Sequence, residues 1–233
     1  MDKDLAVSFF KGIFSGKSLR IYLILLGLIF GSTIAGAIAL FPGYAFFDFS
    51  ISDLGVPLYN PSGWWLFSVA MWSQAVLVIP FFMHVRNIFT KYTPRLARLF
   101  RDAVFATSAG MGWLGFFPDA PPTRGWHFFA AGITFGGFLI DGCISWVTLI
   151  KMGHQSKEHR RKQMIFVLVP VMIIAFWGVL AAIGGSWMLV KLGLLDSASQ
   201  WANLYFWEWC YLGAIGAYML LLGIIISREP ETS

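Results

Sequence analysis

The sequence predicts an all-α membrane protein: a single bundle of six transmembrane helices with both termini in the cytoplasm. Three observations lead to this fold class. Hydrophobic residues make up 58% of the 233 residues and charged residues only 12%, whereas a soluble domain carries about 25% charge. Six apolar runs each approach or exceed the length of about 20 residues that crosses a bilayer. The basic residues gather in alternate connections between these runs, as is typical of membrane proteins.

The six apolar runs follow a basic N-terminal segment, residues 1–20, in which Leu5 to Phe14 form a short amphipathic stretch suited to the membrane surface. We expect the spans at residues 21–43, 63–86, 99–117, 126–150, 164–190 and 204–226. The first run is long for the core of a signal peptide, so we expect it to remain as a helix. The pairs Gly27-x3-Gly31 and Gly132-x3-Gly136 predict close approach between helices. With a short cytoplasmic tail at 227–233, residues 1–233 are expected to form one transmembrane domain.

The lysines and arginines set the predicted orientation. All of the 17 except Arg124 and Lys191 lie in or around the N-terminal segment, the second connection, the fourth connection or the tail. Positive charge stays on the cytoplasmic side, so the connections at 44–62, 118–125 and 191–203 should face the outside or a lumen. The net charge of +5 therefore reflects orientation and contact with anionic lipid heads. We find no groove motif for nucleic acid.

Polar residues from separate segments fall at the predicted outer level. Asp53 lies in the first outer connection, His127 begins the fourth span, and Glu208 lies one turn into the sixth. Ser52 and Asn60 belong to the same connection as Asp53 and would shape its loop. An unpaired carboxylate in hydrocarbon is costly. We therefore expect these groups to converge, with a protonated His127 between the carboxylates of Asp53 and Glu208.

Three hypotheses of function fit this cluster. We favour an accessory or regulatory protein that binds a lipid head group or a lipid-linked partner at an outer-leaflet site formed by Ser52, Asp53, Asn60, His127 and Glu208. The alternative is an integral-membrane lipid hydrolase or acyltransferase, with His127 as base and the carboxylates orienting it or holding a metal ion. The third is a structural or regulatory subunit. The lipid, the membrane, a protein partner and the oligomeric state are left open.

A metal or cofactor is not part of the favoured hypothesis. Carboxylates and one histidine are zinc ligands in other proteins. The sequence has no His-x3-His or Glu-x2-His pair that would place two ligands on one helix face. It also shows no serine or cysteine nucleophile in a recognisable motif. We therefore predict no metal ligands, no cofactor and no catalytic residue.

Three short motifs occur at these polar residues. They are Ile51-Ser52-Asp53-x-Gly55 after the first span, His127 followed by Phe-Phe-Ala-Ala-Gly, and Glu208-Trp209 in the last span. Their order resembles the DRAM/Frag/Sfk superfamily of six-span membrane proteins, which includes autophagy modulators and a domain type of GPI-anchor lipid remodelling. A prokaryotic group of unassigned function is similar in its Ser-Asp-Leu-Gly loop and in a Gly-x-Phe-Pro stretch, here Gly115 to Pro118. The resemblance covers essentially the whole chain and implies lipid-linked membrane biology, although Tyr59-Asn60-Pro61-Ser62 departs from the usual Pro-Glu.

Two further expectations concern packing. Asp141 lies 14 residues after His127, about 21 Å deeper at 1.5 Å per residue. There we expect Arg98 or Arg101 to neutralise it. The connection 44–62 carries several phenylalanines, so we expect it to be ordered and to fold back over the outer ends of the helices.

Overall fold

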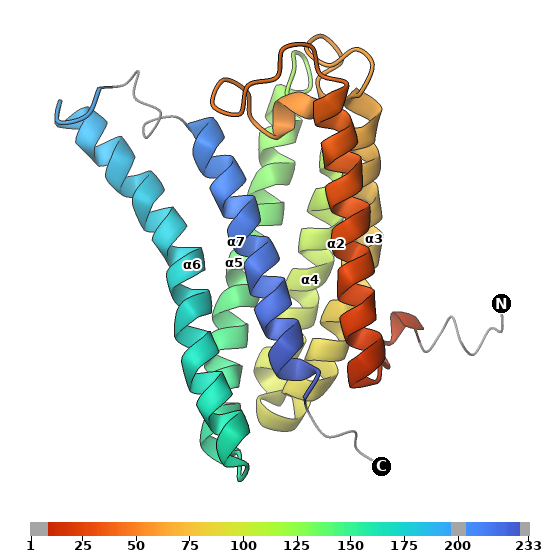
Figure 1. Ribbon diagram of the computed structural model, residues 1–233, viewed down its shortest axis with the longest axis vertical. Coiled ribbons are helices and arrows are strands. Elements are labelled where there is room, and N and C mark those ends of the chain that lie inside the picture. The colour runs from red at the N-terminus through yellow and green to blue at the C-terminus, as the bar shows by residue number, and fades with distance from the viewer. Residues whose placement is uncertain (1–8, 197–203, 229–233) are drawn as a thin grey trace.

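The computed structural model describes residues 9–196 and 204–228 (Figure 1). The regular structure in these residues is all helical, without strands. The long helices are α2 (Gly16–Ala39), α3 (Trp64–Tyr92), α4 (Pro94–Leu114), α5 (Arg124–Gln155), α6 (His159–Lys191) and α7 (Leu204–Ile226). A short 3-10 helix, η1 (Ser52–Gly55), lies between α2 and α3. The prediction of an all-α protein is confirmed, and each expected span falls on one helix.

Five of the described helices are long and apolar enough to cross a membrane. They are α2, α3, α5, α7 and the part of α6 from Lys162 onward. Helix α4 differs because Arg95, Arg98, Arg101 and Asp102 occupy its first half. The chain is therefore a multi-pass integral membrane protein.

The helices pack around α3, α4 and α5 (Figure 1). Helix α2 lies against α3, and α6 lies against α5 and α7. Figure 1 shows α6 leaning away from the other helices toward its C-terminal end. The start of α2 and the end of α7 meet at one end of the bundle, where Gly16 lies directly against the Ser227 carbonyl.

The described part of the N-terminal segment folds against α3. The His84 Nδ1 donates a hydrogen bond to the Gly12 carbonyl at 2.9 Å. Phe14 stacks on Tyr22 with 5.2 Å between ring centroids. Residues 9–14 of the expected surface stretch are thus held by the bundle, while its residues 5–8 lie outside the described residues.

Helices α2 and α7 touch at one end and separate toward the other. A Cβ atom added at Gly223 of α7 would collide with Leu23 of α2. Cβ atoms added further along, at Gly27 of α2 or at Gly213 and Gly216 of α7, would meet nothing within 4 Å. The two helices therefore diverge from the Leu23–Gly223 contact toward the end of the bundle that carries η1.

The predicted close approach at the two Gly-x3-Gly pairs is wrong. Cβ atoms added at Gly27, Gly31, Gly132 and Gly136 would all meet nothing within 4 Å. Close approach occurs instead at Gly137, where an added Cβ would collide with the Thr107 side chain of α4. Spacing alone does not say which face of a helix meets a neighbour.

The connection between α2 and α3 is ordered and covers one end of the bundle, as predicted. Ile51, Leu54 and Val56 are buried, Leu54 completely. Phe46 and Phe47 stay at the surface, each 43% exposed. The loop thus covers the helix ends, is anchored there by the buried Leu54, and places Ser52 over them.

Candidate functional site

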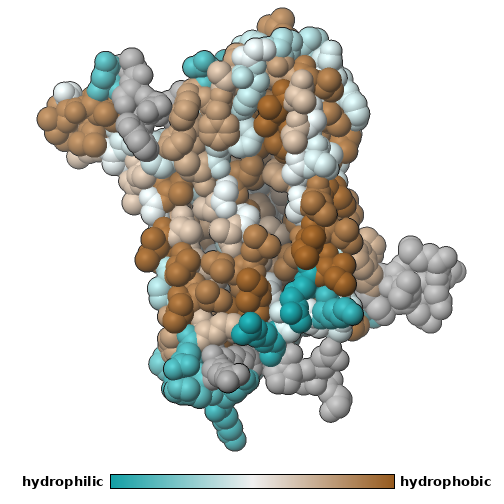
Figure 2. Space-filling model, in the orientation of Figure 1, coloured by the Kyte–Doolittle hydropathy of each residue, from teal (hydrophilic) through white to brown (hydrophobic). Residues whose placement is uncertain are grey.

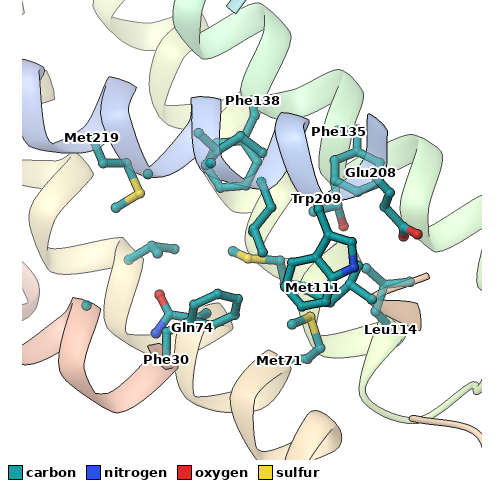
Figure 3. Close-up of a pocket in the computed structure, with 18 of the residues that line it drawn as sticks. Phe30, Met71, Gln74, Met111, Leu114, Phe135, Phe138, Glu208, Trp209 and Met219 are labelled. Carbon is teal, nitrogen blue, oxygen red and sulfur yellow. The ribbon is translucent and has the colours of Figure 1, made fainter. Parts of the chain in front are cut away.

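A cavity of about 440 Å³ lies between α2, α3, α4, α5 and α7. Its wall is almost entirely apolar, with Phe30, Met71, Met111, Phe138 and Met219 around it in Figure 3. Helices α2 and α7 form the side on which they diverge, and Figure 2 shows a hollow on that face. The volume is in the range of small-molecule sites, roughly 300–1,000 Å³.

The cavity is elongated along α7. Its lining extends from Glu208 to Leu220, and twelve residue steps at 1.5 Å span about 18 Å. In Figure 3, Glu208 and Met219 lie at opposite ends of the lined space. Half of a bilayer's hydrocarbon core is about 15 Å thick, so the cavity has the length of one leaflet.

Two polar side chains within the wall, Gln74 and Thr134, are bonded to backbone carbonyls. The buried Gln74 donates from Nε2 to the Leu26 carbonyl of α2 at 3.3 Å. The Thr134 hydroxyl donates to the Ala130 carbonyl of its own helix at 2.9 Å. The lining residues Ser52 and Glu208 lie together at one end. The cavity is therefore apolar along its length and polar at that end.

Three side chains from three segments form a hydrogen-bonded chain at this polar end, which we call the relay. The Ser52 hydroxyl of η1 donates to Glu208 Oε1 of α7 at 2.8 Å. Ser52 Oγ also lies 3.1 Å from Nε2 of His127, which is buried at the start of α5. The other ring nitrogen, Nδ1, lies 2.7 Å from the Phe117 carbonyl. The relay therefore runs from Phe117 through His127 and Ser52 to Glu208.

Ser52 holds the middle position of the relay. A carbonyl only accepts, so His127 Nδ1 carries a hydrogen and donates it to Phe117. Ser52 has one hydroxyl proton, which it donates to Glu208 Oε1. A turn of the same hydroxyl would direct this proton to His127 Nε2, which lies 3.1 Å from Oγ.

Local turn chemistry presents Ser52 to the helices. Asp53 Oδ2 accepts from the Ser50 backbone N–H at 2.8 Å and from the Ser50 hydroxyl at 3.0 Å. The Ser50 hydroxyl oxygen in turn accepts from the Asp53 N–H at 3.1 Å. These reciprocal bonds close the turn that begins η1, and Leu54 anchors it in the core. Asp53 therefore acts on the site by holding the backbone of Ser52.

Asn60 ties the same loop to both neighbouring helices. Its side chain is fully buried. The Nδ2 group donates to the carbonyls of Ala37 and Leu54, each at 3.0 Å. Oδ1 accepts from the Gly63 N–H at 3.0 Å. Asn60 thus satisfies a carbonyl near the end of α2 and an amide at the start of α3.

An aromatic cluster adjoins the polar end. Trp209 lines the cavity; Phe46 stacks on it at 4.9 Å between centroids, and Tyr44 meets it edge-on at 6.4 Å. Burial raises the pKa of the Tyr44 phenol to about 12, and the negative charges of Asp53 and Glu208 act in the same direction. Tyr44 therefore stays a neutral phenol beside the two acids.

The five predicted site residues are all at this end of the bundle, but in different roles. Ser52 and Glu208 line the cavity, His127 lies behind Ser52, and Asp53 and Asn60 bond within the loop. The predicted direct contact of His127 with two carboxylates is wrong, because its two ring nitrogens face Phe117 and Ser52. Within the described residues, no three His, Cys, Asp or Glu side chains gather as metal ligands would.

Sequence reasoning assigned Ser52 to the shape of the loop and missed its place between His127 and Glu208. The Phe117 carbonyl was also missed, although the Gly115 to Pro118 stretch marked its position. Neither pairing leaves a spacing signal, because the relay joins residues 75 and 156 positions apart.

Asp141 is not neutralised by an arginine, contrary to expectation. Its side chain is fully buried, and neither carboxyl oxygen has a hydrogen-bond partner. Arg101 instead pairs with Asp102 at 2.7 Å, and Arg98 is exposed. Both arginines extend away from the interior because a cation is more stable at the interface than beside a buried helix.

Comparison with protein-family models, curated proteins and solved structures gives no match for this chain.

Proposed function

We propose that this chain binds a membrane lipid in the cavity between α2 and α7, with the lipid's polar group at Ser52 and Glu208, and has an accessory or regulatory role in lipid organisation. One observation carries this proposal: an apolar cavity of about 440 Å³ ends at a single polar group of side chains. A lipid has the same division into a long apolar part and one polar end. Lipids are also the most abundant apolar molecules around a membrane protein.

We further propose that all six long helices cross the membrane and that the end bearing Gly16 and Ser227 is cytoplasmic. Helix α4 has 21 residues, about 31 Å at 1.5 Å per residue, which matches a hydrocarbon core of about 30 Å. Only Thr93 separates α3 from α4, so α4 returns across the same depth. Most basic residues adjoin the Gly16 end, which supports the assignment.

On this orientation the lipid enters sideways from the outer leaflet. Helices α2 and α7 are in contact at Leu23 and Gly223, and they separate toward the relay. Gly27, Gly213 and Gly216 border the cavity and leave open space in place of side chains. An acyl chain can therefore pass between the helices while its polar end reaches Glu208.

We also propose kinship with the DRAM/Frag/Sfk superfamily. The motifs that carry this resemblance contain Ser52, His127 and Glu208, which meet in one hydrogen-bonded chain. Three motifs that serve one site give a physical reason for their joint occurrence. This supports a relationship whose shared feature is the set of residues that form the site.

Native mass spectrometry of the purified protein tests lipid binding. Gly213→Leu and Gly216→Leu should fill the cavity from α7 and reduce co-purified lipid several-fold. Gly178→Leu is the matched control, because Gly178 lies on the exposed face of α6 and an added Cβ also meets nothing within 4 Å. Equal amounts of bound lipid in all three variants and the parent would rule out the cavity as the binding site.

A lipid hydrolase or acyltransferase is the second candidate, favoured by the contact between Ser52 Oγ and His127 Nε2 at 3.1 Å. A nucleophile, a base and a group that orients the base, here the Phe117 carbonyl, are the parts of a serine enzyme. Ser52 Oγ would attack an ester carbonyl and pass its proton to His127. His127 would then protonate the departing alcohol, leaving an acyl-serine for water or a second alcohol to resolve. Labelling of Ser52 by a fluorophosphonate, lost in Ser52→Ala, would favour this candidate.

A further inference from the structure

The polar end of the cavity is acidic. Glu208 lines it, and the carboxylates of Asp53 and Asp119 lie near enough to act on Glu208 electrostatically. Arg124, a basic residue near this end, pairs with Asp119, and its Nε lies 2.9 Å from the Asp119 Oδ1. No lysine or arginine is among the described residues that line the cavity. An anionic head group would therefore meet negative charge with no cation in the wall.

Glu208 at this end can accept hydrogen bonds from a ligand. A carboxylate offers about four acceptor positions on its two oxygens, and Ser52 donates to Oε1 of Glu208. The single hydroxyl proton of Ser52 is used within the relay. Trp209 Nε1 is buried without a hydrogen-bond partner, so the site offers a ligand the remaining acceptor positions of Glu208 and one indole N–H.

Aromatic rings complete the surroundings. Trp209 follows Glu208 directly and lines the cavity, with Phe46 stacked on it and Tyr44 at its edge. A cation is attracted to the faces of such rings, by about 0.5–2 kcal/mol in proteins generally. A carboxylate next to an aromatic cluster suits an ammonium group, which is both a cation and a hydrogen-bond donor.

Resting on the proposed lipid-binding function, we propose that the cavity selects long-chain lipids whose polar head carries an ammonium group over lipids that end in a carboxylate or phosphate. The lipid's hydrocarbon chain occupies the space of about 18 Å along α7, between Glu208 and Leu220. The ammonium donates to Glu208 and packs against Trp209. A neutral alcohol of the same length binds less tightly, because it donates without carrying charge.

Three probes of equal length test this selection: hexadecylamine, hexadecanol and hexadecanoic acid. Each is added to the full chain in neutral detergent, and occupancy is measured by native mass spectrometry. The amine should exceed the acid by roughly tenfold or more, the size of one hydrogen bond to a charged group. In Glu208→Gln, which keeps the side-chain shape, this ratio should fall toward one while the alcohol is retained. Gly216→Leu should lose all three probes, and Gly178→Leu none.

The outcomes separate this inference from the function on which it rests. If the acid binds the parent chain as well as the amine, head-group selection is overturned while lipid binding stands. If the ratio persists in Glu208→Gln, Glu208 is not the group that selects, and the inference fails. If no probe distinguishes the parent chain from Gly216→Leu, the cavity binds no lipid and both proposals fail. The amine-to-acid ratio is measured on the parent chain itself, so this part of the test does not depend on whether a variant folds.

Discussion

Ser52 and Glu208 are 156 positions apart in the chain, yet the Ser52 hydroxyl lies 2.8 Å from Glu208 Oε1. One comes from a loop between the first two long helices and the other from the last helix. Their contact joins the connection between α2 and α3 to the last helix, α7, at the polar end of the cavity. It also makes the relay sensitive to any change that moves the loop relative to α7.

The first prediction is that Ser52 transmits the coupling between His127 and Glu208. His127→Ala combined with Glu208→Ala should cost less unfolding free energy than the sum of the single changes, by about 0.5–3 kcal/mol. In a Ser52→Ala background this coupling should vanish, because the serine joins the two groups. Thermal unfolding in detergent measures it. Ser32→Ala, an exposed serine bonded to its own helix, is the control, and strict additivity in the parent would show that no relay exists.

Asn60 should be needed to keep the connection 44–62 ordered, and not to select the ligand. Asn60→Ala leaves buried carbonyls of Ala37 and Leu54 without their donor, which costs about 1–3 kcal/mol for each buried group. Hydrogen exchange of residues 44–62 should rise strongly while exchange in α5 and α6 stays unchanged. The amine-to-acid ratio of bound probes should stay near that of the parent. A loop as protected as in the parent would contradict the role assigned to Asn60.

Asp141 should be a source of instability. A buried carboxyl group without hydrogen bonds costs free energy, so Asp141→Leu is expected to raise the unfolding temperature and Asp141→Asn to leave it nearly unchanged. Asp102→Asn, at an exposed aspartate paired with Arg101, should have an effect near zero. A large loss of stability in Asp141→Asn would show instead that the carboxylate holds a cation.

The proposed topology predicts which side of the membrane each loop faces. Cysteines at Pro57 and Thr123, in a chain with Cys143 and Cys210 replaced, should react with an impermeant maleimide from the outside. A cysteine at Lys157, at the other end of the bundle, should react only after the membrane is opened. Ser197, a third outer position expected from the sequence, lies outside the described residues. Labelling of Pro57→Cys from the cytoplasmic side alone would contradict the six-span arrangement.

Much of the fold was predictable from sequence because hydrophobicity sets helix length in a membrane. The last span was predicted at residues 204–226, where α7 lies. The first was predicted a few residues late, because four of its first five residues, Gly16, Lys17, Ser18 and Arg20, are polar or small. The Ser15 side chain caps this first turn. Polar caps extend a helix beyond its apolar run, and hydropathy does not detect them.

The site was only partly predictable. The cost of a carboxylate in a span singled out Glu208 and, with it, His127. The bridge through Ser52 depends on how a loop turns, which is decided by the Ser50–Asp53 bonds and the burial of Leu54. The cavity was not predicted, because it lies where glycines on α2 and α7 leave space that larger side chains would fill. Gly27, expected to bring helices together, instead borders that space.

The gap between α2 and α7 has a consequence for how occupancy should be measured. A molecule that enters between two helices never leaves the bilayer, so it does not reach the site from water. Occupancy then depends on the fraction of such molecules among the lipids of the leaflet, a concentration in two dimensions. Diluting the protein in buffer should leave the site filled, whereas diluting the leaflet with an unrelated lipid should empty it.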